Sequence, residues 1–400
     1  PRRYQNLFAL PEIRSAMLSS MAGRLPIGIA GFAILLLVQH KTGSFALAGA
    51  ASALYVLGLA SVAPLLGRII DRAGPAALLR ACAIVYPAML IALTALVTMN
   101  AHALAIALCA LVAGAALPPV TICMRTLYPR VLKSPALLQT AFSVDSVIVE
   151  TVFVIGPALV AFFLAFGFPE GAVLLAALTG SLGTVLFIRA PVIRDWEIRA
   201  RSAAPRWGVF GEPGLVVLYI ATIFYSVAFG LYEVGVTAYA TNRSAPAAAG
   251  VALALASLGS AAGAFAYGAR HWQAPLRKQF LIALGLMAAG SLIVAPIGNL
   301  YLFVLANIIA GMPMASVIAT QSLLVSRLAP RGMLAESFTW GGTCLLGGIS
   351  AGLALGGVLA ERVAPPWILI AAAGATGIAA LIAWSMPESE KLHVVGEHNT

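Results

Sequence analysis

Four ionisable side chains stand out because they lie within long apolar stretches of the sequence: Arg24, Asp145, Glu150 and Glu233. In hydrocarbon such a group costs at least about 2.5–3.5 kcal/mol on insertion scales, so each is a functional candidate by default. A carboxyl group can load and release a proton, and an arginine can pair with an acid or bind an anion. The chemistry that these residues predict is therefore solute binding and proton coupling.

Arg24 and Glu150 are predicted to lie at similar depths. Arg24 is about 11 residues into its apolar stretch and Glu150 about 12, which at ~1.5 Å per residue places both about 16–18 Å deep. We therefore predict that these two side chains pair or share a polar network near the midplane of a membrane. The alternative is a static structural ion pair without a role in transport.

The other two acids are expected to have different roles. Asp145 lies about 10 Å from the cytoplasmic end of its stretch, which suits a gate partner for Arg72 or Arg125. Because Asp145 is five residues from Glu150, it projects about 140° away on a helix, so the two acids face different surroundings. For Glu233, near the opposite face, two interpretations stay open: it lines an outer cavity, or it is simply hydrated.

The composition indicates that these residues are set in membrane-spanning helices. Of the 400 residues, 61% are hydrophobic and 10% charged, whereas a soluble domain carries roughly 25% charged residues. Apolar runs of about 20 residues recur, which is the length that crosses ~30 Å of hydrocarbon as a helix. A β-barrel would need alternating runs of about ten residues, and these runs do not alternate.

We predict an all-α membrane protein of twelve transmembrane helices. The predicted spans are Ile13–Leu37, Ser44–Leu66, Ala76–Val97, Leu104–Met124, Leu138–Phe166, Ala172–Ile188, Gly214–Ala240, Ala247–Tyr267, Phe280–Ile297, Tyr301–Leu324, Ser337–Leu359 and Trp367–Trp384.

The net charge is +10, and the distribution of the basic residues predicts the orientation of the chain in the membrane. With the N-terminus in the cytoplasm, nearly all arginines and lysines between the spans fall on the cytoplasmic side, and only Lys41, Arg243 and Arg362 fall on the other. This strong positive-inside bias predicts a bacterial inner-membrane protein with both termini in the cytoplasm. The basic balance then indicates contact with the lipid bilayer, and no nucleic-acid partner is expected.

A weak internal repeat divides the chain into two halves. Gly311 follows Gly114 by 197 positions, and Gly352 follows Gly156 by 196, as Phe338 follows Phe142. Near-identical offsets in adjacent helices favour two pseudosymmetric six-helix bundles. The predicted units are an N-terminal bundle (1–190), a cytoplasmic linker (191–212), a C-terminal bundle (213–386) and a cytoplasmic tail (387–400). For the linker, a short interfacial helix that includes Trp196 and a solvated loop both stay open.

One motif carries a family resemblance. The segment from Gly67 to Gly74 contains Asp71 and Arg72 and resembles the cytoplasmic signature of the major facilitator superfamily: Gly, three residues, Asp, Arg or Lys, any residue, Gly. The match is shortened, because Pro75 and the following alanine replace the two basic residues that usually continue it. The resemblance covers nearly the whole chain and implies a transporter that works by alternating access.

The resemblance also implies a cytoplasmic gate. Gly67 and Gly74 allow close approach and a tight turn, and Asp71 would face the positive N-terminal end of the eleventh helix near Glu336. Arg72 would bridge to an acid on a neighbouring helix. Such contacts hold the cytoplasmic side closed in one state and break in the other.

The direction of transport is predicted less firmly than the architecture. Gly156-Pro157 is a fragment of a longer pattern that exporters of the superfamily carry in the fifth helix, and Pro157 also permits a helix bend. The leading prediction is efflux of small organic molecules in exchange for protons. The alternative is uptake, by proton symport or uniport, of an organic anion or a nutrient, with Arg24 as the ligand of the anion.

Aromatic and amide side chains within the spans are further candidates for a central cavity, although packing would explain each of them alone. They are Tyr55, Tyr219, Tyr225, Tyr232, Asn307, Gln321 and Trp340. An intramembrane enzyme is poorly supported, because neither a Ser–His arrangement nor a metal-binding cluster is apparent. We expect a monomer with a small-molecule substrate, protons as the coupling ion, and no cofactor or metal.

Overall fold

The computed structural model describes residues 2–196, 208–270 and 272–386, and this part of the chain contains helices and no strands. Twelve of its helical spans are long and apolar enough to cross a membrane. The predicted all-α class and the twelve spans are therefore confirmed. Part of the predicted linker (197–207) and the predicted tail (387–400) lie outside the described residues.

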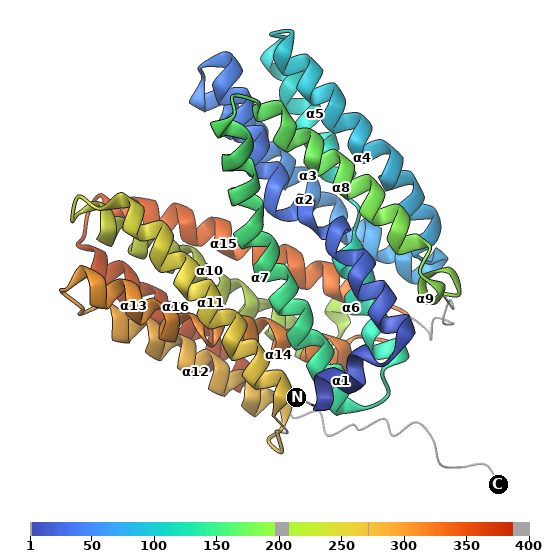
Figure 1. The fold of residues 1–400 in the computed structure, drawn as a ribbon. Helices are drawn as coiled ribbons and strands as arrows, with labels where there is room; N and C mark the ends of the chain where they lie inside the picture. Colours follow the sequence, from blue (N-terminus) through green and yellow to red (C-terminus); the bar gives the residue numbers. More distant parts are fainter. Residues whose placement is uncertain (1, 197–207, 271, 387–400) are drawn as a thin grey trace.

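The first half of the chain forms one lobe, drawn from blue to green in Figure 1. Its helices are α1 (Arg2–Phe8), α2 (Pro11–Thr42), α3 (Phe45–Ala73), α4 (Pro75–Thr98), α5 (Ala103–Ala115), α6 (Val120–Val131), α7 (Pro135–Ala165), α8 (Pro169–Ile188) and α9 (Pro191–Arg194). We call this the N lobe.

The second half forms the C lobe, drawn from yellow to red. After a short 3-10 turn η1 (Gly208–Gly211) it contains α10 (Pro213–Thr241), α11 (Pro246–Ala269), α12 (Leu276–Val294), α13 (Leu300–Gly311), α14 (Met314–Leu328), α15 (Leu334–Ala360) and α16 (Pro365–Trp384). Each lobe thus holds six membrane spans, although the exact domain bounds given above stay a prediction.

Two spans that the sequence predicts as single helices are each broken in two. The fourth span breaks between α5 and α6 at residues 116–119, and the tenth breaks between α13 and α14. Pro118, Pro119 and Pro313 lie at these breaks, where proline removes a backbone donor and clashes with the preceding turn. The prediction of unbroken helices is wrong here, and the breaks fall at equivalent places in the two lobes.

The lobes meet around a pseudo-twofold axis. Phe142 of α7 and Phe338 of α15 occupy equivalent positions in the repeat, and their ring centroids lie 6.0 Å apart. Two side chains related by a twofold axis touch each other only close to that axis. The centre of the molecule is therefore lined by α7 and α15 and by the helices beside them.

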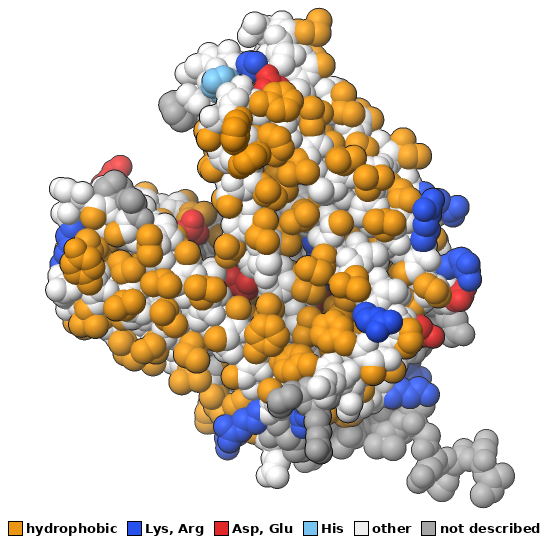
Figure 2. Space-filling view, in the orientation of Figure 1, with side chains coloured by type: hydrophobic (Ala, Val, Ile, Leu, Met, Phe, Trp, Pro, Cys, Tyr) orange, Lys and Arg blue, Asp and Glu red, His pale blue; other side chains and the backbone are white. Residues whose placement is uncertain are grey.

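The two lobes touch on the side of α1 and diverge on the opposite side (Figure 1). Figure 2 shows the hollow between them, with apolar side chains over most of the outer faces of both lobes. Apolar outer faces are what a lipid-embedded bundle requires. The structure is thus closed on the α1 side and open on the other.

Glycines let α7 and α2 approach each other closely within the N lobe. A Cβ on Gly156 of α7 would lie 2.4 Å from the backbone of Gly28 in α2, so neither position has room for a side chain. Pro157 lies within α7, which is helical on both sides of it. We therefore assign Gly156 to close packing, and the bend at Pro157 stays a prediction.

Candidate functional site

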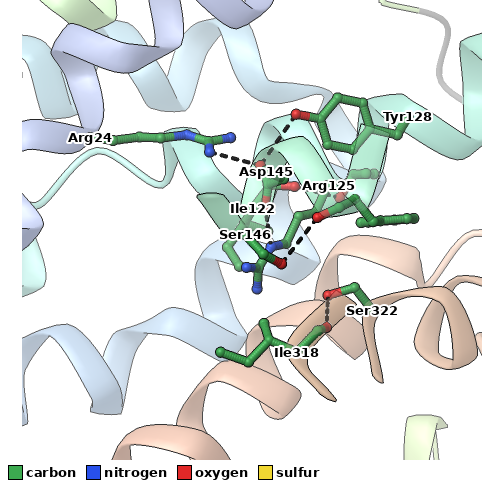
Figure 3. Close-up of polar contacts among 10 residues, drawn as sticks. Arg24, Ile122, Arg125, Tyr128, Asp145, Ser146, Ile318 and Ser322 are labelled. Carbon is green, nitrogen blue, oxygen red and sulfur yellow. Dashed lines mark hydrogen bonds and ion pairs between the residues drawn. The ribbon is translucent and has the colours of Figure 1, made fainter. Parts of the chain in front are cut away.

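Three side chains of the N lobe converge on Asp145 of α7, as Figure 3 shows. Arg24 Nη1 from α2 lies 2.7 Å from Asp145 Oδ1, and Arg125 Nε from α6 lies 2.8 Å from Oδ2. The hydroxyl of Tyr128 donates to Oδ1 at 3.2 Å. Arg24 and Asp145 are each only 1% exposed. Two arginines thus share one acid, which leaves this cluster with an excess positive charge.

The predicted pair of Arg24 with Glu150 is not formed, because Arg24 binds Asp145 instead. Five residues along a helix change the depth by only ~7.5 Å, so both acids were within reach of a long arginine side chain. The side of α7 on which each acid lies determines which one pairs with Arg24. Asp145 faces α2 and α6, whereas Glu150, about 140° away around the helix, faces α11 of the C lobe.

Glu150 takes part in a hydrogen-bond chain that joins the lobes. Ser260 of α11 donates to Glu150 Oε1 at 3.1 Å, and the same hydroxyl accepts from the backbone N–H of Ala315 at 3.0 Å. Ala315 lies in the first turn of α14, where the N-cap residue Pro313 supplies no side-chain cap. Ser260 therefore caps the broken tenth span and holds the carboxyl group of Glu150 near the positive end of a helix dipole.

On the α1 side, Asp71 of α3 caps a helix of the other lobe. It accepts from the backbone N–H groups of Ala335 at 3.1 Å and Glu336 at 2.9 Å, in the first turn of α15. The predicted contact is confirmed. These bonds satisfy orphan donors and place a negative charge at the positive end of α15. Gly67–Arg72 of the motif lie in the last turns of α3.

An ion pair that the sequence did not predict reinforces this contact. Arg68 Nε lies 2.7 Å from Glu336 Oε1. Arg72, which was predicted to bridge to an acid, has an exposed side chain and forms no ion pair with any residue that the structure describes. Arg130 instead lies 3.9 Å from Asp71. Asp71, Arg68 and Gly67 lie on the face of α3 that meets α15. Arg72, about 100° from Asp71 around the helix, lies at the edge of that face.

A second contact between the lobes joins α7 to α11. Gln139 donates to the carbonyl of Tyr267 at 2.8 Å, and Thr140 donates to that of Gly268 at 3.0 Å. Tyr4 of α1 donates to the carbonyl of Phe265 at 2.7 Å, and burial raises the pKa of Tyr4 to about 12, so it remains a donor. We call these three bonds the α7–α11 clasp. Its acceptors are backbone carbonyls, which carry no signal in a sequence.

The closed contact at α3 can be tested by adding a side chain to Gly67. A Cβ there would lie 2.8 Å from Glu336 Cα and 2.7 Å from Thr339 Oγ1. Overpacking of this kind costs typically about 1–3 kcal/mol, which corresponds to about 5–150-fold in a population ratio. We expect Gly67→Val to shift the protein towards the state open on the α1 side.

The shift is measured as the distance between spin labels placed at the ends of α3 and α15 in proteoliposomes. Gly49→Val on the same helix is the matched control, because a Cβ at Gly49 meets nothing within 4 Å. A distance distribution for Gly67→Val that matches that of Gly49→Val would contradict the assignment of this contact as a gate.

Most of the aromatic and amide candidates are buried in hydrogen bonds within one lobe. Tyr225 donates to Gln321 at 2.7 Å, and Tyr232 bonds to Asn307. Tyr55 bonds to its neighbour Tyr86 at 3.1 Å. For Tyr55, Tyr225, Tyr232 and Asn307 the structure supports the packing interpretation.

Two of the predicted residues border the space between the lobes. Gln321 and Arg125 line a small cavity from opposite lobes, together with Ser322, Gly341 and Gly342. Trp340 is partly buried against Phe210, with ring centroids 4.8 Å apart. Glu233 of α10 has an exposed side chain, so neither of its two interpretations is excluded.

The cavity beside Arg125 is asymmetric in charge. By the offset of the repeat, Ser322 stands where Arg125 stands in the N lobe, and Gly341 stands where Asp145 does. Figure 3 shows Ser322 on the helix that faces Arg125. The charged groups of the centre therefore come from the N lobe, and the C lobe offers an amide and a hydroxyl across the gap.

A comparison with models of known families identifies one family. The family model described as Major Facilitator Superfamily matches residues 16–345. A search of curated protein sequences found no match. Solved structures of similar fold include a bacterial homologue of the iron transporter ferroportin in an outward-facing state, with 13% identity, coverage of 93% of this chain and 98% of that one, and a TM-score of 0.76.

Two further structures have the same fold. The human organic anion transporter MFSD10 has 16% identity, with coverage of 93% and 99% and a TM-score of 0.72. The fucose:proton symporter of E. coli has 13% identity, with coverage of 96% and 100% and a TM-score of 0.69. At these identities the likeness concerns the fold alone.

Proposed function

Because the chain belongs to the major facilitator superfamily, we propose that it is a secondary active transporter that carries a small organic anion together with a proton by alternating access. Membership makes it a multi-pass membrane protein and a transporter rather than an enzyme. We place α1 on the cytoplasmic side of a bacterial inner membrane, in line with the positive-inside distribution of arginines, and we take the working unit to be a monomer.

With this orientation the structure is closed to the cytoplasm and open to the outside. The cytoplasmic side is held by Asp71 on the first turn of α15, by Arg68 with Glu336, and by the α7–α11 clasp. We propose that these contacts form the gate, and that they break when the lobes rock into the inward-open state.

The observation that carries the proposal is the shared acid of the central cluster. Asp145 is bound by Arg24 and Arg125 at once, so one positive charge is in excess. Arg24 is buried and acts as a positioning residue. Arg125 is 13% exposed and borders the cavity between the lobes, where a carboxylate or phosphate of a solute would bind it and hydrogen bond to Gln321 or Ser322.

Glu150 is the proposed proton carrier, since it lies between the lobes and no cation of the described chain pairs with it. With Glu150 ionised, the two arginines and the two acids of the centre sum to zero. Protonation of Glu150 leaves a net charge of plus one, which favours an anion. By reciprocity the bound anion then favours the proton, so both cross in the same direction and the result is symport.

Efflux in exchange for protons remains a second candidate. It is favoured by the same carboxyl group, because a cationic solute and a proton would compete for Glu150 and thus cross in opposite directions. The Gly156-Pro157 pair is consistent with an exporter but serves close packing against α2. The two candidates differ in the sign of the solute and in the direction of the accompanying proton.

The proposal is tested by flux measurements in proteoliposomes with a panel of labelled organic anions and cations. We expect uptake of an anion that is stimulated by an inward proton gradient. Arg125→Gln is expected to reduce anion uptake by roughly 10–100-fold, since charge-assisted bonds contribute about 1.5–3 kcal/mol, and Arg125→Lys should restore part of it.

Arg362→Gln is the control, because Arg362 is exposed in the turn between α15 and α16. Transport of cations alone, or anion uptake by Arg125→Gln equal to that of Arg362→Gln, would overturn the assignment of an anionic solute. In the efflux alternative, Arg24→Gln would remove coupling while leaving solute exchange.

A further inference from the structure

A groove on the outer face of the C lobe is separate from the central site. It has a volume of about 390 Å³ and lies between α11, α12 and the broken tenth span. Its walls are mostly apolar, with Ala266, Ile282, Leu286, Ala289 and Ile309 among them. These five side chains are exposed, so the groove opens towards the surroundings of the lobe, which in a membrane are the acyl chains of lipids.

The end of the groove on the α1 side is basic and aromatic. Arg270 and Trp272 line it, and the guanidinium of Arg270 lies 5.2 Å from the centre of the Trp272 ring. The indole N–H of Trp272 donates to the carbonyl of Tyr267 at 3.1 Å, which fixes the ring. Lys278, at the start of α12, is exposed close by in the chain. None of the described residues that line the groove is acidic.

We propose that this groove binds an anionic phospholipid of the leaflet on the α1 side, with an acyl chain along its apolar walls and the phosphate at Arg270. Arg270 forms no ion pair with a described acid, so its charge is available. A basic mouth between membrane helices is a recognition site for acidic headgroups, and tryptophan is favoured at the level of the headgroups.

The groove shares residues with the closed gate. Tyr267 lines the groove, and its backbone carbonyl accepts from Gln139 of the α7–α11 clasp. Arg270 also lines the groove, and its backbone carbonyl accepts from Arg3 at 3.0 Å. The groove also reaches Pro313, which precedes the turn capped by Ser260. A phospholipid that orders this segment therefore stabilises the state closed on the α1 side.

The proposal is tested by native mass spectrometry of the purified full-length protein titrated with phosphatidylglycerol or phosphatidylcholine. We expect tighter binding of phosphatidylglycerol at one site. Arg270→Gln and Lys278→Gln should each weaken it by about 5-fold, since a basic residue near the membrane surface contributes about that factor. Ala289→Phe, which fills the groove without changing charge, should weaken both lipids.

Lys41→Gln and Arg362→Gln are matched controls, because they remove surface charges on the side opposite α1. Circular dichroism of each variant establishes that it is folded, and Lys278→Gln and Ala289→Phe keep the test decisive if Arg270→Gln does not fold. Equal affinity for the two lipids in the unaltered protein, or phosphatidylglycerol binding that neither Lys278→Gln nor Ala289→Phe weakens, would overturn the proposal whatever solute is carried.

Discussion

Glu150→Gln is expected to abolish the stimulation of transport by a proton gradient while leaving solute exchange across the membrane intact. Glutamine keeps a carbonyl oxygen that can accept from Ser260, so the link between α7 and α11 is retained. The amide cannot take up a proton, so the linkage between proton and solute is lost. Coupling free energies between sites are typically about 1–3 kcal/mol, so the stimulation should fall by roughly 5–150-fold.

The measurement compares gradient-driven uptake with counterflow, in which unlabelled solute inside the vesicles drives entry of labelled solute without a proton gradient. Glu361→Gln is the matched control, because Glu361 is exposed in the turn between α15 and α16 and lies outside the hydrogen-bond chain. If gradient-driven uptake by Glu150→Gln equals that of the unaltered protein, Glu150 has no part in the mechanism.

Asp145→Asn is expected to lower the stability of the protein more than any other single change in the central site. Asp145 is the shared partner of Arg24 and Arg125, and Arg24 is only 1% exposed. Asparagine still accepts from Tyr128 but leaves a buried guanidinium without a counter-charge. Breaking a buried ion pair by removing one partner costs about 3–5 kcal/mol, and the result should be a clear fall in the midpoint of thermal unfolding.

Unfolding is followed by circular dichroism in detergent, with Glu12→Gln, an exposed acid of the same lobe, as control. The double variant Arg24→Gln/Asp145→Asn removes both charges of the pair and should recover part of the loss, because residues in contact are not additive. An unfolding midpoint for Asp145→Asn equal to that of Glu12→Gln would contradict a structural role for the cluster.

The sequence predicts the architecture well because the bilayer imposes it. A run of about 20 apolar residues has to be helical in lipid, so all twelve spans follow from length and composition. The contact of Asp71 with α15 followed from the family motif, which names both the acid and a glycine one helical turn before it. Phe142 and Phe338, recognised only as a repeat, mark the axis between the lobes.

The sequence could not predict the partners of the charged residues, because these depend on the rotation of each helix. A depth estimate put Arg24 level with Glu150, yet only Asp145 faces α2. The capping of α14 by Ser260 also depends on a break at Pro313 that hydropathy does not detect. Bonds to backbone carbonyls, such as that of Gln139 with Tyr267, leave no pattern of residue types.

The account depends most on the claim that the solute and the proton cross together. The direct test loads proteoliposomes with a pH-sensitive dye, imposes no proton gradient, and adds the transported anion outside. We predict that the anion gradient acidifies the interior in the unaltered protein and fails to do so in Glu150→Gln. If the interior pH stays constant or rises during anion entry, the claim that the anion and the proton cross together is contradicted.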